Sequence, residues 1–121
     1  MAEMDIYEQV GADTDRADAK AVFERMAAAH AAGDSQTAVR EALTLVDHPG
    51  VTENGRVSAW LVLGKGYLAL GVYTQALQYL SLYLNSPRGQ YQENRLGALE
   101  AFLAAYNGHQ LDIDDDIYDD A

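Results

Sequence analysis

The chain has 121 residues, of which 49% are hydrophobic, and it contains no cysteine. This composition fits one small domain and excludes disulfides and thiolate metal sites. The formal net charge of −11 disfavours binding to nucleic acid or to anionic membranes and favours a basic surface as the partner. The sequence has neither a secretory signal nor an apolar run of the about 18 residues expected of a membrane span, so we expect a cytoplasmic protein.

The charge is concentrated at the two ends of the chain. Residues 1–18 carry six acids and one base, and residues 109–121 carry six aspartates and no base. The intervening residues 19–108 carry seven acids and seven bases. We therefore divide the chain into an acidic N-terminal segment (1–15) with room for a short helix, a neutral helical domain (16–107), and an acidic tail (108–121) that we expect to be disordered.

Glycine and proline residues divide the neutral domain into five predicted helices. Gly33 and Gly71 end the first and third helices, because a left-handed backbone costs glycine nothing. Pro49 and Pro87 follow the second and fourth helices, which proline cannot continue. The predicted helices cover residues 16–32, 35–47, 53–70, 73–85 and 89–106.

Side chains that accept backbone hydrogen bonds precede two of these helices. Asp13, Thr14 or Asp15 can cap the first helix, and Asp34 can cap the second. The dipeptide at 107–108, Asn-Gly, is predicted to end the fifth helix.

A spacing of 38 residues relates the first two helices to the next two. The related pairs are Gly33 and Gly71, Ala38 and Ala76, and Pro49 and Pro87. Residues 49–55 between the two units are rich in turn-forming residues, which predicts an extended connection.

Apolar residues recur at steps of three and four in the second unit, as on one face of a helix. The third helix has Val57, Trp60, Leu61, Gly64, Tyr67 and Leu68, and the fourth has Ala76, Leu80 and Tyr83. Gly64 weakens a helix, so we expect a neighbouring helix to pack closely against it. Tyr79 and Leu82 lie off this face and fit either core packing or a dimer contact.

The second unit resembles a tetratricopeptide (TPR) repeat, which has the order W-x2-L-G-x2-Y followed by a small residue and a proline. The matching residues are Trp60, Leu63, Gly64, Tyr67, Ala76 and Pro87. The resemblance implies an all-α solenoid of helical hairpins, with repeats at about 19–49 and 57–87 and a capping helix at about 89–106. It also implies a non-enzymatic module that binds a peptide or helix of another protein.

In TPR domains the first helix of each hairpin forms the inner surface, so the resemblance implies a groove. Its expected partner-binding residues are Lys20, Phe23, His30, Leu61, Lys65, Leu68, Arg95 and Phe102, with Ala27 and Ala98 between them. This surface is apolar with three basic residues and suits an acidic, apolar peptide. The alternative is that Phe23, Leu61 and Phe102 belong to the core.

The acidic tail interleaves apolar residues with aspartate, a pattern typical of a docking motif that orders on binding. Its candidate partner-binding residues are Leu111, Asp112, Ile113, Asp114, Asp116, Ile117 and Tyr118. The alternative is a solvated tail without a target. Asp112, Asp114 and Asp116 begin like a calcium loop, but Ile117 stands where that loop needs glycine.

No catalytic, metal or cofactor motif is present in the sequence, and Gly64-Lys65-Gly66 lacks the preceding glycine of a phosphate loop. We therefore expect no enzyme activity, no cofactor and no metal. The leading hypothesis is a TPR adaptor or scaffold that can also self-associate. A small secretion-type chaperone that holds an extended client segment is the second hypothesis. An acidic decoy that inhibits a nucleic-acid-binding protein is the third.

Overall fold

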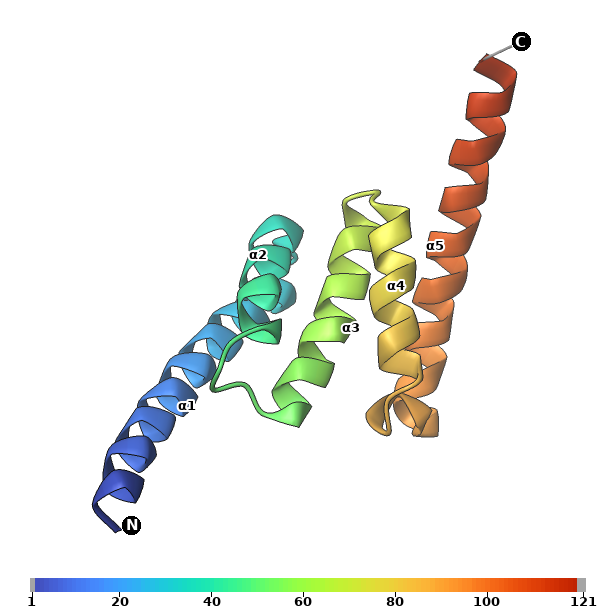
Figure 1. Cartoon of the computed structure of the whole chain (residues 1–121). Coiled ribbons are helices and arrows are strands. Elements are labelled where there is room, and N and C mark those ends of the chain that lie inside the picture. The colour runs from blue at the N-terminus through green and yellow to red at the C-terminus, as the bar shows by residue number, and fades with distance from the viewer. Residues whose placement is uncertain (1, 120–121) are drawn as a thin grey trace.

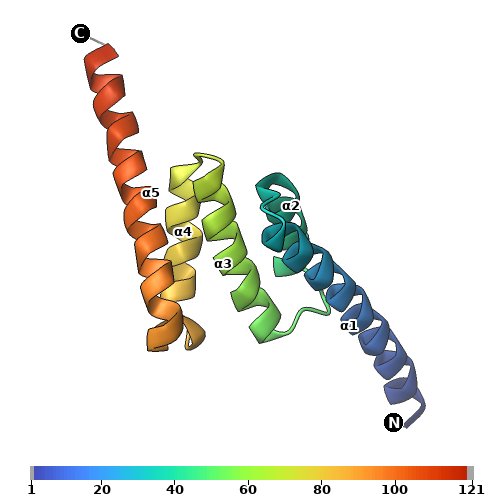
Figure 2. The ribbon, with the colours of Figure 1, turned by 180° about the vertical axis from the view of Figure 1, so that it is seen from behind.

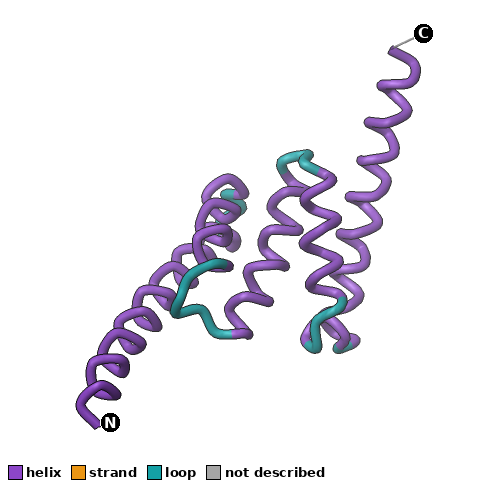
Figure 3. Tube along the Cα trace, viewed as in Figure 1, coloured by secondary structure: helices purple, strands orange, loops and turns teal. Residues whose placement is uncertain are grey.

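The computed structural model describes residues 2–119, and side chains over residues 11–113. Every regular element in residues 2–119 is helical, which confirms the expected all-α class. Figure 1 shows the elements side by side in chain order, and Figure 3 shows that short loops connect them. The elements are α1 (Ala2–Ala31), α2 (Ser35–Val46), α3 (Glu53–Ala69), α4 (Tyr73–Leu84), the 3-10 helix η1 (Arg88–Gln90) and α5 (Gln92–Asp119).

The boundaries between α1 and α4 follow the residues expected to set them. Gly33 and Gly71 have φ angles of 76° and 75°, in the left-handed region where glycine ends a helix without strain. The Asp34 carboxylate accepts a hydrogen bond from the backbone N–H of Thr37 at 3.2 Å and caps α2. The Thr52 hydroxyl accepts one from the Gly55 N–H at 2.9 Å and caps α3.

The first helix is longer than predicted. It starts at Ala2 and runs through Asp13, Thr14 and Asp15, so none of these three residues caps a helix. Asp13 instead forms an ion pair with Arg16 one turn later on the helix surface. Side chains spaced by three residues meet on a helix and support its continuation.

The last helix is also longer than predicted. It begins at Gln92, because η1 occupies residues 88–90, and continues through Asn107 and Gly108 to Asp119. Gly108 is not a helix end, since it has no left-handed φ. A Cβ atom at Gly108 would lie 2.5 Å from Tyr73 Cε1, so glycine there allows α5 to approach α4. We predicted that residues 108–121 are disordered in the absence of a partner, and this stays a prediction.

Helix α3 lies at the centre of the fold and contacts α1, α2, α4 and α5. A single apolar face was predicted for it, but buried residues surround its axis, as expected for a helix enclosed by neighbours. The residues missed by the predicted face are Ala59, Val62, Leu63 and Gly66. The predicted face of α4 is confirmed, because Ala76, Leu80 and Tyr83 are all buried.

Two glycines of α3 face opposite neighbours. A Cβ atom at Gly64 would lie 2.5 Å from Leu80 Cγ in α4, and one at Gly66 would lie 2.6 Å from Val39 Cγ2 in α2. The close helix packing expected at Gly64 is therefore present. The Gly64-Lys65-Gly66 run serves helix packing on both sides of α3.

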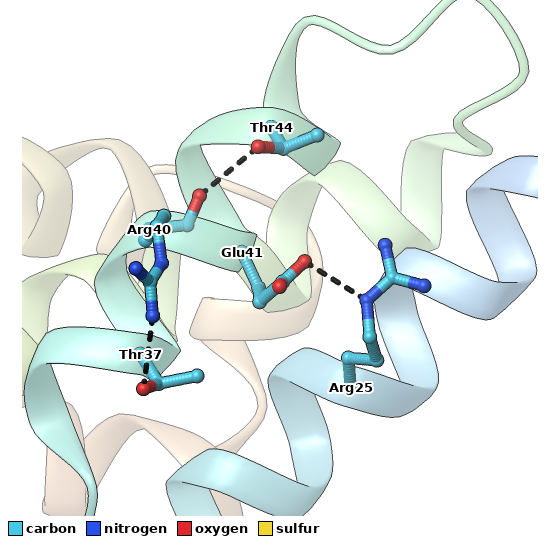
Figure 4. A network of polar contacts seen from close by, with 5 residues as sticks. All are labelled: Arg25, Thr37, Arg40, Glu41 and Thr44. Carbon is cyan, nitrogen blue, oxygen red and sulfur yellow. Dashed lines mark hydrogen bonds and ion pairs between the residues drawn. The ribbon is translucent and has the colours of Figure 1, made fainter.

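An ion pair joins the two helices of the first hairpin. Arg25 Nε of α1 donates to Glu41 Oε2 of α2 at 3.3 Å. Figure 4 shows this pair beside a second set of contacts within α2, in which Arg40 donates to Thr37 and Thr44 donates to the Arg40 carbonyl oxygen. Surface contacts of this kind contribute up to about 1 kcal/mol each, so the buried apolar residues dominate the packing.

Candidate protein-interaction groove

A groove runs along α1 and α3 and is formed by two adjoining cavities of about 370 Å³ and about 300 Å³. Phe23 of α1, Ser58 of α3 and Arg88 of η1 line both cavities, which connects them. Phe23 is 36% exposed although it is a large apolar residue. We call these two cavities together the inner groove.

The first cavity lies where α1 meets the connection between the two hairpins. Gly50, Val51 and Thr52 form one wall, opposite Ala19 and Phe23 of α1. The connection folds back on itself: the Gly50 N–H donates to His48 Nδ1 at 3.0 Å, and the Val51 N–H donates to the His48 carbonyl oxygen at 3.1 Å.

Close contact with α1 explains why residue 50 is glycine. A Cβ atom at Gly50 would overlap the carbonyl group of Asp15 in the α1 backbone. The connection is therefore packed against α1, which fixes the shape of the first cavity.

The charged residues that line the inner groove are all basic. Arg16, Lys20 and Arg88 line the first cavity, and among residues 11–113 no carboxylate lines either cavity. Arg16 pairs with Asp13, and an Arg88 guanidinium nitrogen donates to Ser58 Oγ at 3.3 Å. Lys20 forms no hydrogen bond or ion pair with any residue between positions 11 and 113. Three of the eight basic residues of an acidic chain thus meet at one groove.

The second cavity lies between α1 and α3. Phe23, Ala27 and His30 of α1 face Leu61 of α3 across it. Buried Tyr83 also lines this cavity, and burial raises the pKa of its hydroxyl. A neutral phenol and an apolar wall suit an apolar side chain of a bound peptide.

The structure brings together about half of the predicted groove residues. Lys20, Phe23, Ala27, His30 and Leu61 line the inner groove. The predicted residues that line neither cavity are Lys65, Leu68, Arg95, Ala98 and Phe102.

Three of these five residues belong to the hydrophobic core. Leu68 and Phe102 pack against the cluster of Ala76, Leu80 and Ala105. Ala98 is buried with Val57 and Tyr83 in a separate cluster. Phe102 therefore packs in the core, Leu61 packs against both clusters and also lines the second cavity, and Phe23 lies in the groove.

Sequence reasoning missed most of the other residues that line the groove, among them the polar residues Arg16, Ser58, Arg88 and Asn94. Arg95 was expected to line the groove, but Arg88 and Asn94 line it instead. The reason is that η1 occupies residues 88–90, so α5 begins at residue 92 and not at residue 89. The only sequence signal for Arg88 is its position directly after Pro87, where a turn is expected.

The tail residues lie on the distal part of α5. Leu111, Asp112 and Ile113 are exposed, and the side chains of Asp114, Asp116, Ile117 and Tyr118 lie outside the described ones. Figures 1 and 2 both show this end of α5 pointing away from α1. The described part of the tail, residues 108–119, therefore extends away from the inner groove of the same chain.

Over residues 11–113 no group of three or more histidine or acidic side chains could hold a metal ion, and no buried side-chain nitrogen or oxygen atom lacks a hydrogen-bond partner. No helix in the described part of the chain is both long enough and apolar enough to cross a membrane. The inner groove thus offers shape, apolar contact and positive charge.

No family model, curated protein or solved structure matches the chain. The function is therefore argued from the inner groove itself.

Proposed function

We propose that this chain is a non-enzymatic, TPR-like interaction module whose inner groove binds an acidic, apolar segment of a partner protein. The observation that carries this proposal is the lining of the groove. Arg16, Lys20 and Arg88 surround the apolar ring of Phe23, without a carboxylate, in a chain with a net charge of −11. Opposite charges orient such a segment, and the apolar contacts supply much of its affinity.

The arrangement of the helices supports a TPR-like solenoid. The two hairpins end their first helices at Gly33 and Gly71 with nearly equal φ angles, and these glycines are 38 residues apart. The first helices, α1 and α3, contact each other and line the groove, as in a solenoid whose inner face is formed by equivalent elements.

The chain itself contains a segment of the required chemistry, which provides a defined probe. Residues 109–121 alternate aspartates with Leu111, Ile113, Ile117 and Tyr118. Because α5 points away from α1, we propose that this tail docks on another molecule.

The test is fluorescence anisotropy of the full chain with a labelled peptide of residues 109–121. We expect saturable binding that is lost when the four apolar residues of the peptide are replaced by serine at unchanged charge. Lys20→Glu should weaken binding by about fivefold to tenfold, since it reverses a charge at the groove. Phe23→Ala should weaken it by about tenfold or more.

A matched control separates the groove from general attraction. Lys65→Glu makes the same charge change on α3 but outside the residues that line the groove. It should leave the affinity within about twofold. If Lys65→Glu weakens binding as much as Lys20→Glu does, or if the serine peptide binds equally well, the proposal is wrong.

Salt dependence distinguishes this module from an acidic decoy. The apolar contacts at Phe23 and Leu61 do not weaken with salt, so we expect the peptide complex to persist at high ionic strength. A decoy for a nucleic-acid-binding protein would instead lose its partner steeply as salt rises.

A further inference from the structure

The outward face of α5 carries large apolar side chains that no other element covers. Leu96, Leu103, Tyr106 and Ile113 are 64%, 57%, 46% and 40% exposed. Half-buried Leu99 lies between the first two. Single exposed apolar residues are ordinary on a protein surface, but several along one helix mark an interaction site.

These residues follow the spacing of a helix that pairs with another helix. The steps from Leu96 to Leu99, Leu103 and Tyr106 are three, four and three residues, and Ile113 follows one heptad after Tyr106. This is the alternation of a coiled-coil seam. We call these five residues the α5 stripe.

The opposite face of α5 holds small residues, and that face packs on the body of the protein. Ala98 and Ala105 are buried, and Gly108 lies against the ring of Tyr73 in α4. Apart from Phe102, which packs in the core, the helix therefore turns small residues inward and leaves large apolar residues outward. The terminal helix of a solenoid needs a polar outer face to stay soluble alone. The α5 stripe instead makes the outer face of this terminal helix apolar.

We propose that the α5 stripe pairs with the α5 stripe of a second copy of this chain, in antiparallel orientation around a two-fold axis. A two-fold interface uses the same patch on both copies. A stripe of identical spacing on two 28-residue helices, each about 42 Å long, meets this requirement.

The charges along the chain select the antiparallel orientation. Residues 109–119 carry five aspartates and no base, whereas residues 88–108 carry two arginines and two glutamates. A parallel pair would bring two strongly acidic ends together. An antiparallel pair brings each acidic end to the start of the partner's α5, where Arg95 lies and the preceding η1 carries Arg88.

The first test is the mass of the full chain in solution, measured by sedimentation equilibrium over a range of micromolar concentrations. We expect twice the 13.2 kDa of one chain. Leu103→Asp should give the monomer mass with an unchanged helical circular dichroism spectrum, because Leu103 is exposed in one copy. Leu43→Asp, at an exposed leucine of α2, is the control and should remain a dimer.

Two results would overturn the proposal. A monomer mass for the full chain at every concentration excludes the dimer. A dimer that survives Leu103→Asp excludes the α5 stripe as its interface, and one that dissociates with Leu82→Asp instead moves the interface to α4, where Leu82 is exposed.

The second test reports the orientation through disulfide crosslinking, since the chain has no cysteine of its own. A mixture of Leu96→Cys and Ile113→Cys chains should form mixed crosslinked dimers under mild oxidation. Neither variant alone should crosslink efficiently, because equivalent ends lie far apart in an antiparallel pair. Efficient crosslinking of Leu96→Cys with itself would show a parallel pair and contradict the proposal.

Discussion

The absence of a side chain at two positions of α3 determines how closely this helix approaches its neighbours. A Cβ atom at Gly64 would meet Leu80, which is fully buried and cannot swing outward. A Cβ atom at Gly66 would meet Val39 on the other side of the helix. Glycine costs a helix about 1 kcal/mol relative to alanine, and here that cost is offset by the packing it permits.

Gly64→Ala should therefore destabilise the protein although alanine favours helix. Overpacking costs about 1–3 kcal/mol, and the gain in helix propensity is about 1 kcal/mol at most. We expect the free energy of unfolding in urea to fall by about 1 kcal/mol. Gly97→Ala in α5 is the matched control, because no atom lies within 4 Å of its added Cβ, and it should gain about 0.5–1 kcal/mol. A Gly64→Ala protein as stable as the original would contradict the close packing of α3 and α4.

Two tyrosines make the fold sensitive to alkaline pH. Burial raises the pKa of both Tyr79 and Tyr83 above the ordinary value of 10.0, and at Tyr79 the ring of Tyr67, stacked at 6.0 Å, adds to this effect. The folded state thus holds these protons more tightly than the unfolded state does. The two tyrosines therefore contribute fully to the free energy of unfolding below the pKa that they have in the unfolded state. This contribution is lost as the pH rises through the higher pKa that they have in the folded state.

We expect the urea midpoint to fall as the pH is raised above about 10. Tyr79→Phe cannot ionise, so this variant should lose less stability over the same pH range. The check is a series of urea titrations of both proteins at increasing pH. Equal pH dependence of the variant and the original would show that Tyr79 contributes nothing to it.

At the scale of the elements, the connection between the hairpins contributes both to the stability of the fold and to the shape of the first cavity. Gly50 packs on the α1 backbone at Asp15, and the following residues form a wall of the first cavity. Gly50→Ala should lower the free energy of unfolding by about 1–3 kcal/mol, because backbone atoms of α1 cannot move aside. It should also weaken binding of the tail peptide, measured by anisotropy.

Gly11→Ala is the control for this change. Gly11 lies in α1 and an added Cβ there meets no atom within 4 Å, so alanine should stabilise the helix slightly. If Gly50→Ala leaves both stability and peptide affinity unchanged, the connection does not fix the first cavity.

The lengths of the inner helices could be predicted from sequence, but those of the outer helices could not. Gly33, Gly71 and Asp34 act through local backbone geometry, which the sequence encodes directly. Asp13 and Gly108 carry the same kinds of local signal, yet a helix passes through both. At Gly108 the deciding factor is the ring of Tyr73, a tertiary contact that no local pattern reveals.

At the scale of the whole molecule, the groove could be predicted on α1 and α3 but not at α5. The family resemblance assigned Phe23 and Leu61 to the inner surface, and both line the groove. It also assigned Phe102, which packs into the core beside Ala105. The 3-10 turn η1 shifts the start of α5 and brings Arg88 to the groove, and this shift depends on a buried Gly89 against the backbone of Tyr83.

At the scale of the whole molecule, the inner groove and the ends of the chain carry opposite charge. The inner groove is basic and apolar, whereas both ends of the chain are acidic. One face therefore suits an acidic partner segment, and the outward face of α5 suits a second copy. The inner groove and the α5 stripe share no residue, although Ile113 belongs both to the stripe and to the tail peptide, so Lys20→Glu and Leu103→Asp test the two proposals separately.

The most direct test of the central claim is an amide chemical-shift map of the ¹⁵N-labelled full chain, titrated with unlabelled peptide of residues 109–121. We expect saturable shifts concentrated at residues 16–30, 50–62 and 88, which surround the inner groove. Residues 35–42, the part of α2 that lines neither cavity, should remain unchanged. Shifts spread evenly over the chain, confined to α5, or absent at saturating peptide would contradict a peptide-binding groove between α1 and α3.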